Sequence, residues 1–174
     1  MAEFVAFLRG INVGGHKSVP MVKAKQIFED LGFANVRTIL ASGNIIFEAK
    51  DTIVKLARII TNQLQDSFGF SIPVIVRPRA DITRIVKADP FAGNSVTKDM
   101  RLYITFLPEE PLQVPRLPYH TPDNSFSVLA LSDCMVFSVL DLSKNGTPEA
   151  MKILEKQFGK NITTRNWNTL VKIA

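Results

Sequence analysis

The sequence predicts an α+β fold of two subdomains, the first of them ferredoxin-like. Four short apolar runs typical of β-strands lie within residues 3–77. Two stretches with apolar residues at helical spacing alternate with them in the order β-α-β-β-α-β, which is that of a split βαβ unit. The chain has 174 residues, enough for one domain with a substantial core or for two small subdomains that share one.

The first strand and the first helix have clear sequence signals. An apolar run at residues 3–9 ends in glycines, which is typical of a strand. Pro20 stands where a first helical turn would begin, and an amphipathic stretch continues to Leu31. Gly32 is expected to end this helix as a cap.

A hairpin and a second helix follow. The tripeptide SGN at 42–44 is a hairpin-type turn signal between two apolar runs. Asp51 is expected to cap a helix whose apolar residues recur at helical spacing as far as Phe68. The strands expected in this first subdomain, residues 1–78, are 3–9, 36–41, 45–47 and 72–76.

Residues 79–174 are predicted to form a second, smaller α+β subdomain. Its long connection at 108–124 holds half of the ten prolines, so we expect a stiff, extended surface loop there and no regular element. The other expected elements are helices at 81–87, 147–158 and 164–173 and strands at 102–107, 126–131 and 135–142.

The first strand also predicts how the subdomains pack. Residues 4–8 read FVAFL, so both of its alternate faces are apolar. A ferredoxin-like sheet standing alone needs only one apolar face. We therefore expect the second subdomain to cover the other face, with the glycine-rich loop near the junction.

The charge balance allows an anionic partner without requiring one. The chain has 21 basic and 16 acidic residues and a formal net charge of +5, but no block of like charges. A nucleic-acid-binding module is therefore a weaker alternative. An RNA-recognition domain is disfavoured because SGNIIF at 42–47 lacks the basic and aromatic positions of that motif.

Cysteine content and the N-terminal sequence predict the cellular compartment of the protein. Cys134 is the only cysteine, so no internal disulfide can form and a reducing cytoplasm fits best. The N-terminus lacks the pattern of a signal peptide, and no apolar run approaches the length of a membrane span. We expect a soluble, cytoplasmic protein that does not associate with a membrane.

The segment GINVGGHKS at 10–18 approaches a phosphate-binding P-loop. His16 intrudes between the last glycine and Lys17, and Ser18 precedes the expected helix instead of lying in its first turn. A P-loop aims consecutive backbone N–H groups and a helix N-terminus at one phosphate, so a Walker NTPase is rejected. Two interpretations remain: a purely structural loop, and a looser anion site. The anion site would use Arg9, Lys17 and the amides of Gly14 and Gly15.

The turn at 42–44 has two interpretations as well. Ser42 and Asn44 could offer a hydroxyl and an amide to a ligand, whereas Gly43 is better explained by a tight turn that needs positive φ. Ser42 as a nucleophile is disfavoured because no G-x-S-x-G elbow surrounds it. Its only candidate bases are His16 in the glycine loop and His120 in the proline-rich connection.

The segment TTRNWNT at 163–169 is expected to open the last helix, with Thr163 or Thr164 as its cap. Trp167, Leu170, Val171 and Ala174 have the spacing of a buried face, so Trp167 is assigned to the core rather than to a ligand platform. Three further polar residues crowd the helix start, where one cap would suffice. These residues, Arg165, Asn166 and Asn168, are suited to hold a phosphate or carboxylate.

No metal, cofactor or acid–base pair is indicated. Two isolated histidines and one cysteine form no ligand set, and Glu109 and Glu110 precede a proline in the exposed connection. Whether the protein is an enzyme stays open, because an enzyme would have to rely on substrate positioning and arginine electrostatics.

Five segments of the chain resemble a family catalogued as domain of unknown function 1697. They are LRGINVGG at 8–15, VPM at 19–21, ASGNIIF at 41–47, YITFL at 103–107 and TTRNWNT at 163–169. The resemblance implies a small bacterial α+β protein of two subdomains, the first ferredoxin-like. It implies no established activity and no catalytic residues.

The leading functional hypothesis is a cytoplasmic protein that binds an anionic small molecule, such as a nucleotide or phosphoester, where three polar segments meet. Arg9, Lys17 and Arg165 would supply charge, and Asn12, Ser42, Asn44, Asn166 and Asn168 would supply directional hydrogen bonds, with the amides of Gly14 and Gly15. The alternatives are a nucleic-acid-binding module, and an oligomerisation or partner-binding module that uses residues 108–124.

Overall fold

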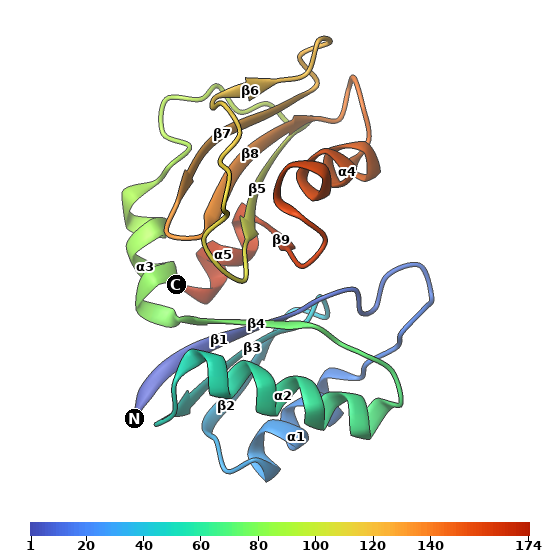
Figure 1. Cartoon of the computed structure of the whole chain (residues 1–174), viewed down its shortest axis with the longest axis vertical. Coiled ribbons are helices and arrows are strands. Elements are labelled where there is room, and N and C mark those ends of the chain that lie inside the picture. Colours follow the sequence, from blue (N-terminus) through green and yellow to red (C-terminus); the bar gives the residue numbers. More distant parts are fainter. The chain divides into compact units, whose positions relative to one another are not determined.

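The computed structural model describes residues 1–174 and divides into two compact units. The first unit comprises Met1–Lys87 with Val171–Ala174, and the second comprises Ala88–Leu170 (Figure 1). The sequence places a boundary after residue 78, whereas the first unit continues through the next helix. Five helices and two antiparallel sheets confirm the α+β class.

The first unit has the predicted element order β-α-β-β-α-β, followed by a third helix. Its sheet has the order β2-β3-β1-β4, and all three strand pairs are antiparallel. Figure 1 shows α1 and α2 together on one side of this sheet. The elements are β1 (Ala2–Leu8), α1 (Met21–Asp30), β2 (Ala34–Ile39), β3 (Asn44–Ala49), α2 (Ile53–Phe68), β4 (Val74–Pro78) and α3 (Arg79–Ala88).

The core of the first unit lies between the sheet and its two helices. Phe47 on β3 is its aromatic centre, with ring centroids 5.2 Å from Phe28 and 4.7 Å from Phe33. Val5 and Phe7, on the opposite face of β1, are also fully buried. Both faces of β1 are therefore buried, as its apolar sequence predicts.

The cap of α2 differs from the prediction. Thr52, not Asp51, is the N-cap, and its hydroxyl accepts a hydrogen bond from the Lys55 amide at 3.4 Å. The Asp51 carboxylate instead pairs with the Lys55 ammonium at 2.7 Å. Both residues suit the first turn, so only the register of the helix decides which one caps it.

The second unit is built on a sheet of order β6-β7-β8-β5-β9. The expectation that residues 108–124 contain no regular element is wrong at one point, because Tyr119 and His120 pair with Val128 and Ser127. The elements are β5 (Met100–Phe106), β6 (Tyr119–His120), β7 (Phe126–Ser132), β8 (Met135–Asp141), α4 (Thr147–Phe158), β9 (Thr163–Asn166) and α5 (Trp167–Ile173).

The predicted start of the last helix, at residue 164, is also wrong. Thr163–Asn166 form an edge strand that pairs with β5, so neither Thr163 nor Thr164 is a helix cap. Burial alternates along this segment with the period of two that a strand requires, and β-branched threonines favour strands. Asn166 takes the capping position instead, since its Oδ1 accepts the Asn168 amide at 3.0 Å.

The buried face of α5 is also displaced from the prediction. Leu170 and Ile173 are buried, whereas Val171 is 49% exposed. Trp167 is half-buried and packs edge-on against Phe91, with ring centroids 5.2 Å apart. This packing supports a place in the core over a ligand platform.

In neither unit is there a helix whose length and apolar character would let it span a bilayer.

Gly43 lies where the turn at residues 40–43 touches the end of β1. Its carbonyl oxygen accepts the Leu8 amide at 2.8 Å, and its φ is +84°. A Cβ at this position would lie 2.8 Å from Ile11 Cδ1 and 2.9 Å from Leu8 Cβ. Backbone conformation and close approach therefore both require glycine.

Gly43→Ala is expected to lower the free energy of unfolding by about 2–4 kcal/mol, because left-handed strain adds to overpacking. Gly69 is the matched control, since its φ is +77° and nothing lies within 4 Å of its Cβ position. Gly69→Ala should cost only the strain, about 1–2 kcal/mol. Urea unfolding measures both, and equal losses would contradict the packing argument.

Candidate functional site

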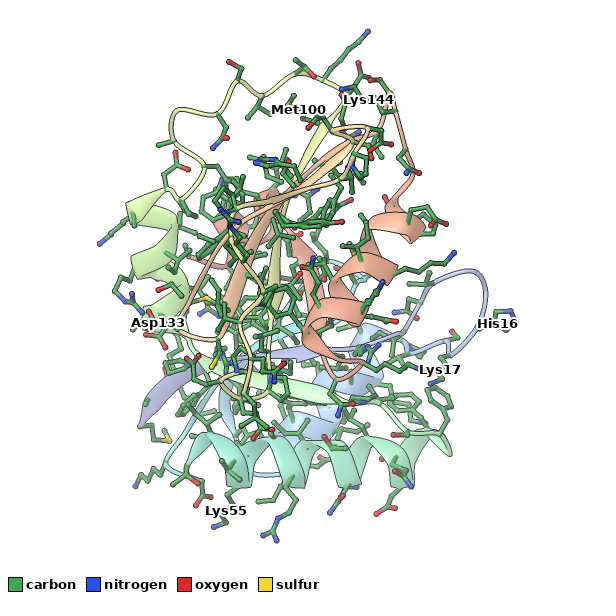
Figure 2. All side chains as sticks on the ribbon, turned by 45° about the horizontal axis from the view of Figure 1, so that its top comes forward. His16, Lys17, Lys55, Met100, Asp133 and Lys144 are labelled. Atoms are coloured by element: carbon green, nitrogen blue, oxygen red, sulfur yellow. The ribbon has the colours of Figure 1, made fainter.

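The segment after β1 forms a small exposed finger, residues 12–17. The Asn12 amide donates to the Lys17 carbonyl and the His16 amide to the Val13 carbonyl, both at 3.2 Å. Gly14 and Gly15 have φ of +61° and +75°, the two positive values that a type I′ turn needs. Figure 2 shows His16 at the outer end of the finger, pointing into solvent.

This geometry is unlike a P-loop, because α1 begins only at Met21, several residues beyond the glycines. Two donors nevertheless remain at the tip. The Gly14 and Gly15 amides make no hydrogen bond, and nothing lies within 4 Å of a Cβ position at either residue. Successive free N–H groups in a turn can bind an anion.

The Asn12 side chain fixes the base of the finger. Its Nδ2 donates to the carbonyls of Val19 at 3.0 Å and Ala41 at 2.8 Å, and its Oδ1 accepts the Val19 amide at 2.8 Å. Both amide hydrogens are therefore used within the protein. Asn12 joins the finger, the approach to α1 and the turn at 40–43, so two of the three polar segments meet.

Asn44 is likewise part of the scaffold. It is fully buried, and its Nδ2 donates to the Ile39 carbonyl at 2.8 Å and to Ser42 Oγ at 3.0 Å. These bonds close the turn between β2 and β3. Ser42 is exposed, so its hydroxyl is the group of this turn that a ligand can reach.

Two lysines flank the end of α2 in the first unit. Lys17 Nζ donates to the Ser71 carbonyl at 3.3 Å and lies 5.8 Å from the centre of the Phe70 ring. Lys23 Nζ donates to the Ser67 carbonyl at 3.3 Å and lies 4.7 Å from the Phe68 ring centre. Cations are favoured near the carbonyl end of a helix and over aromatic rings.

Sequence reasoning identified Lys17 but not Lys23. The two lysines become neighbours of one helix end only through the packing of the chain. Arg9, also predicted as a site residue, is half-buried, and its amide donates to the Pro73 carbonyl at 2.9 Å.

The third polar segment belongs to the second unit, where Arg165 is only 8% exposed. Its Nη1 donates to Thr163 Oγ1 and to the Thr164 carbonyl, both at 3.0 Å. Burial lowers the pKa of Arg165 to about 10, so the side chain stays charged at neutral pH. Asn166 caps α5, and Asn168 is exposed with no side-chain hydrogen bond.

The second unit also contains a polar cavity of about 250 Å³ that sequence reasoning missed. His120 and Ser127 line it, with 2.7 Å between His120 Nδ1 and Ser127 Oγ. They face each other because they are register partners in β6 and β7. Since β6 was not predicted, nothing in the sequence indicated this contact.

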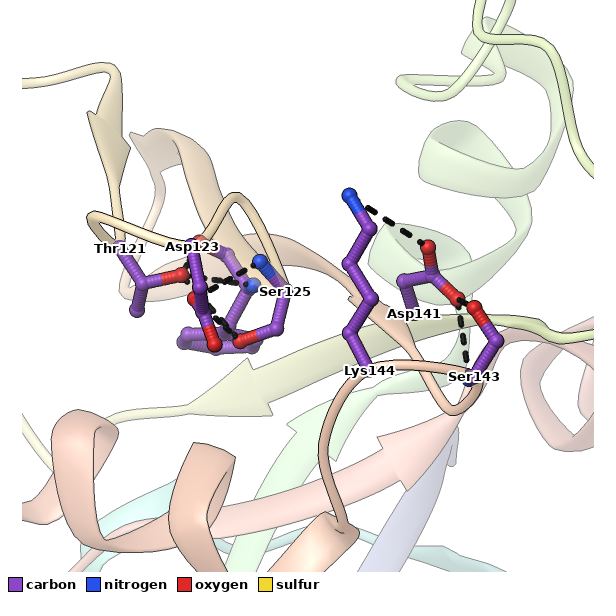
Figure 3. Close-up of polar contacts among 7 residues, drawn as sticks. Thr121, Asp123, Ser125, Asp141, Ser143 and Lys144 are labelled. Atoms are coloured by element: carbon purple, nitrogen blue, oxygen red, sulfur yellow. Dashed lines mark hydrogen bonds and ion pairs between the residues drawn. The ribbon is translucent and has the colours of Figure 1, made fainter.

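Figure 3 shows two carboxylate-centred turns, of which Ser125, Asp141 and Lys144 line this cavity. Asp123 accepts the Ser125 amide at 3.0 Å and the Ser125 hydroxyl at 2.7 Å. Asp141 similarly accepts both groups of Ser143, and Lys144 Nζ lies 4.0 Å from its Oδ2. No three histidine, cysteine or carboxylate side chains come together anywhere as a metal site.

Asn12→Ala is expected to lower the free energy of unfolding by about 1–3 kcal/mol, because three partly exposed hydrogen bonds are lost. Hydrogen exchange should also become faster at the Val19 amide, which loses its acceptor. Asn168→Ala is the control, because that side chain bonds nothing. Equal stabilities of the two variants in urea would contradict the structural role of Asn12.

Acid titration should expose the contribution of Asp123. Hydrogen bonds from the Thr121 and Ser125 side chains lower its pKa from 3.8 to about 2. The folded state thus favours the carboxylate. The contribution of this carboxylate to the free energy of unfolding is therefore complete above about pH 4 and is lost as the pH falls through about 2. The stability difference between wild type and Asp123→Asn should shrink over that range. Urea unfolding at several pH values checks this, with Asp66→Asn as an exposed control, and a constant difference would refute it.

The chain is similar to a solved bacterial structure and matches a protein family. The solved structure of the conserved bacterial protein SP0830 from Streptococcus pneumoniae is similar, with a TM-score of 0.68 and 22% identity. The similarity covers 99% of this chain and 96% of that one, and it shows the fold alone. No curated protein matches the sequence. Residues 1–133 match the family described as "Protein of unknown function (DUF1697)", and the chain therefore belongs to that family.

Proposed function

We propose that this protein is a cytoplasmic binding protein for an anionic small molecule, a nucleotide or another phosphoester, contacted by the glycine finger. The observation that carries the proposal is the pair of unbonded amides at Gly14 and Gly15, held on an anchored finger. Two neighbouring N–H groups of one turn can donate hydrogen bonds to the oxygens of one phosphate group.

Nearby positive charge supports an anion over a neutral ligand. Lys17 directly follows the turn, and Arg9 precedes the finger in the same unit. The net charge of +5 adds a long-range attraction that raises the local concentration of anions. Hydrogen bonds between charged partners are about twice as strong as neutral ones.

The structure changes the roles proposed for the asparagines. Asn12 and Asn44 hold the finger and the turn in place, so they act as positioning residues rather than ligand donors. Ser42 remains a proposed contact because its hydroxyl is exposed. In the second unit Asn168 keeps a free amide, whereas Arg165 is buried and Asn166 caps α5.

Calorimetric titration with ATP, AMP and inorganic phosphate tests the proposal. Lys17→Gln should weaken binding about fivefold to tenfold, as expected for the loss of one charge-assisted contact. Lys50→Gln removes the same charge from an exposed, unbonded side chain of the first unit and should leave the affinity nearly unchanged. Equal effects of the two variants, or no heat with any of the three anions, would refute the proposal.

A nucleic-acid ligand is the second candidate, favoured by the two lysines that lie over Phe70 and Phe68 at the end of α2. Basic side chains beside aromatic rings are common in single-strand binding grooves. An oligothymidylate should then bind more tightly than ATP, with an affinity that falls steeply with salt. In that case Lys23→Gln should weaken binding as much as Lys17→Gln.

A further inference from the structure

A groove of about 590 Å³ in the first unit lies between the start of β1 and one face of α3. Ala2, Pro78 and Ala80 form its apolar wall. Its volume is within the range of small-molecule sites, which usually combine an apolar lining with a few polar groups. None of the residues predicted as site residues lines it.

The polar groups of the groove come from successive turns of α3. Arg79, Thr83 and Lys87 are four residues apart, so they lie along one face of the helix, and Arg84 lies beside them. Three of the groove's side chains are cationic and Glu3 is its only acidic side chain, while the chain terminus at Ala174 also lines it. Positive side chains therefore outnumber negative ones in the lining.

The Arg79 guanidinium is held rigidly. Its Nε donates to the Ile173 carbonyl at 2.8 Å, its Nη2 to Ala174 O at 3.0 Å and its Nη1 to Glu3 Oε2 at 2.8 Å. A guanidinium has five N–H groups, so about two remain for a ligand. Little side-chain entropy would be lost when such a fixed cation binds an anion.

The carboxylate of Glu3 is largely neutralised within the protein. Its Oε1 accepts Arg37 Nη2 at 2.6 Å, while its Oε2 accepts Arg79. Lys87 and the Thr83 hydroxyl, by contrast, have no hydrogen-bond or ionic partner. A cation and a hydroxyl donor of the lining thus have no partner, whereas its one acidic side chain is already paired twice and Ala174 O accepts Arg79.

From these observations we infer that the groove binds a phosphate monoester with a small apolar group. The phosphate would contact Arg79, Thr83 and Lys87, and the organic group would lie against Pro78 and Ala80. Arginine, lysine and hydroxyl donors are the usual set for a phosphate that carries two charges.

The groove is distinct from the glycine finger. It lies at the first residues of β1, whereas the finger follows the last, and seven strand residues span about 20 Å. The inference goes beyond the proposed function, and either one can fail without the other.

Phenyl phosphate is the probe, followed by ¹H–¹⁵N correlation spectra of the full chain. We expect it to shift the amide signals of α3 and to bind more tightly than inorganic phosphate, because the phenyl group adds apolar contact. Lys87→Gln should weaken binding about fivefold to tenfold and Thr83→Val about threefold, as expected for one charged and one neutral contact.

Lys17→Gln separates the two sites, since it should leave phenyl phosphate binding at α3 unchanged. Lys50→Gln controls for net charge. All three glutamine variants change exposed side chains, so they should fold. No shift at α3, shifts confined to the glycine finger, or equal weakening by Lys87→Gln and Lys50→Gln would each overturn the inference.

Discussion

The first unit depends on the burial of β1, one of its two interior strands, from Phe4 to Leu8. Pairing with β3 and β4 satisfies the backbone groups along the strand, so only the groups at its two ends need other partners. At the end of the strand the turn at 40–43 supplies a carbonyl and accepts the Asn12 amide. At its start Glu3 is held by Arg37 and Arg79. The finger and the α3 groove, both candidate sites, lie at these ends.

The first half of the fold could be predicted because its signals are local. The apolar spacing of α1, Pro20 before it and Gly32 after it act within a few residues of one another. β6 could not be predicted because it is only two residues long and lies in a proline-rich segment, and β9 could not because its partner β5 is distant in the sequence. Thr163–Asn166 suits a helix start as well as a strand, and the open edge of β5 decides between them.

In the candidate site, too, some features follow from the local sequence, whereas others depend on residues that are distant in the sequence. The turn at Gly14 and Gly15 follows from the sequence, since few residues other than glycine adopt two successive positive φ values. The roles of Asn12 and Asn44 do not, because an amide side chain serves a ligand or a backbone carbonyl equally well. Only the folded chain brings the Ala41 and Ile39 carbonyls within their reach.

The finger is firmly held at its base, while its tip contacts nothing. Loop closure entropy rises only slowly with length, by about 0.6 kcal/mol for each doubling. The bond between Gly14 and Gly15 is consequently a place in the first unit where extra residues can be added at a small cost in stability. A peptide tag or fluorophore inserted there would extend into solvent, and the sheet below would keep its register.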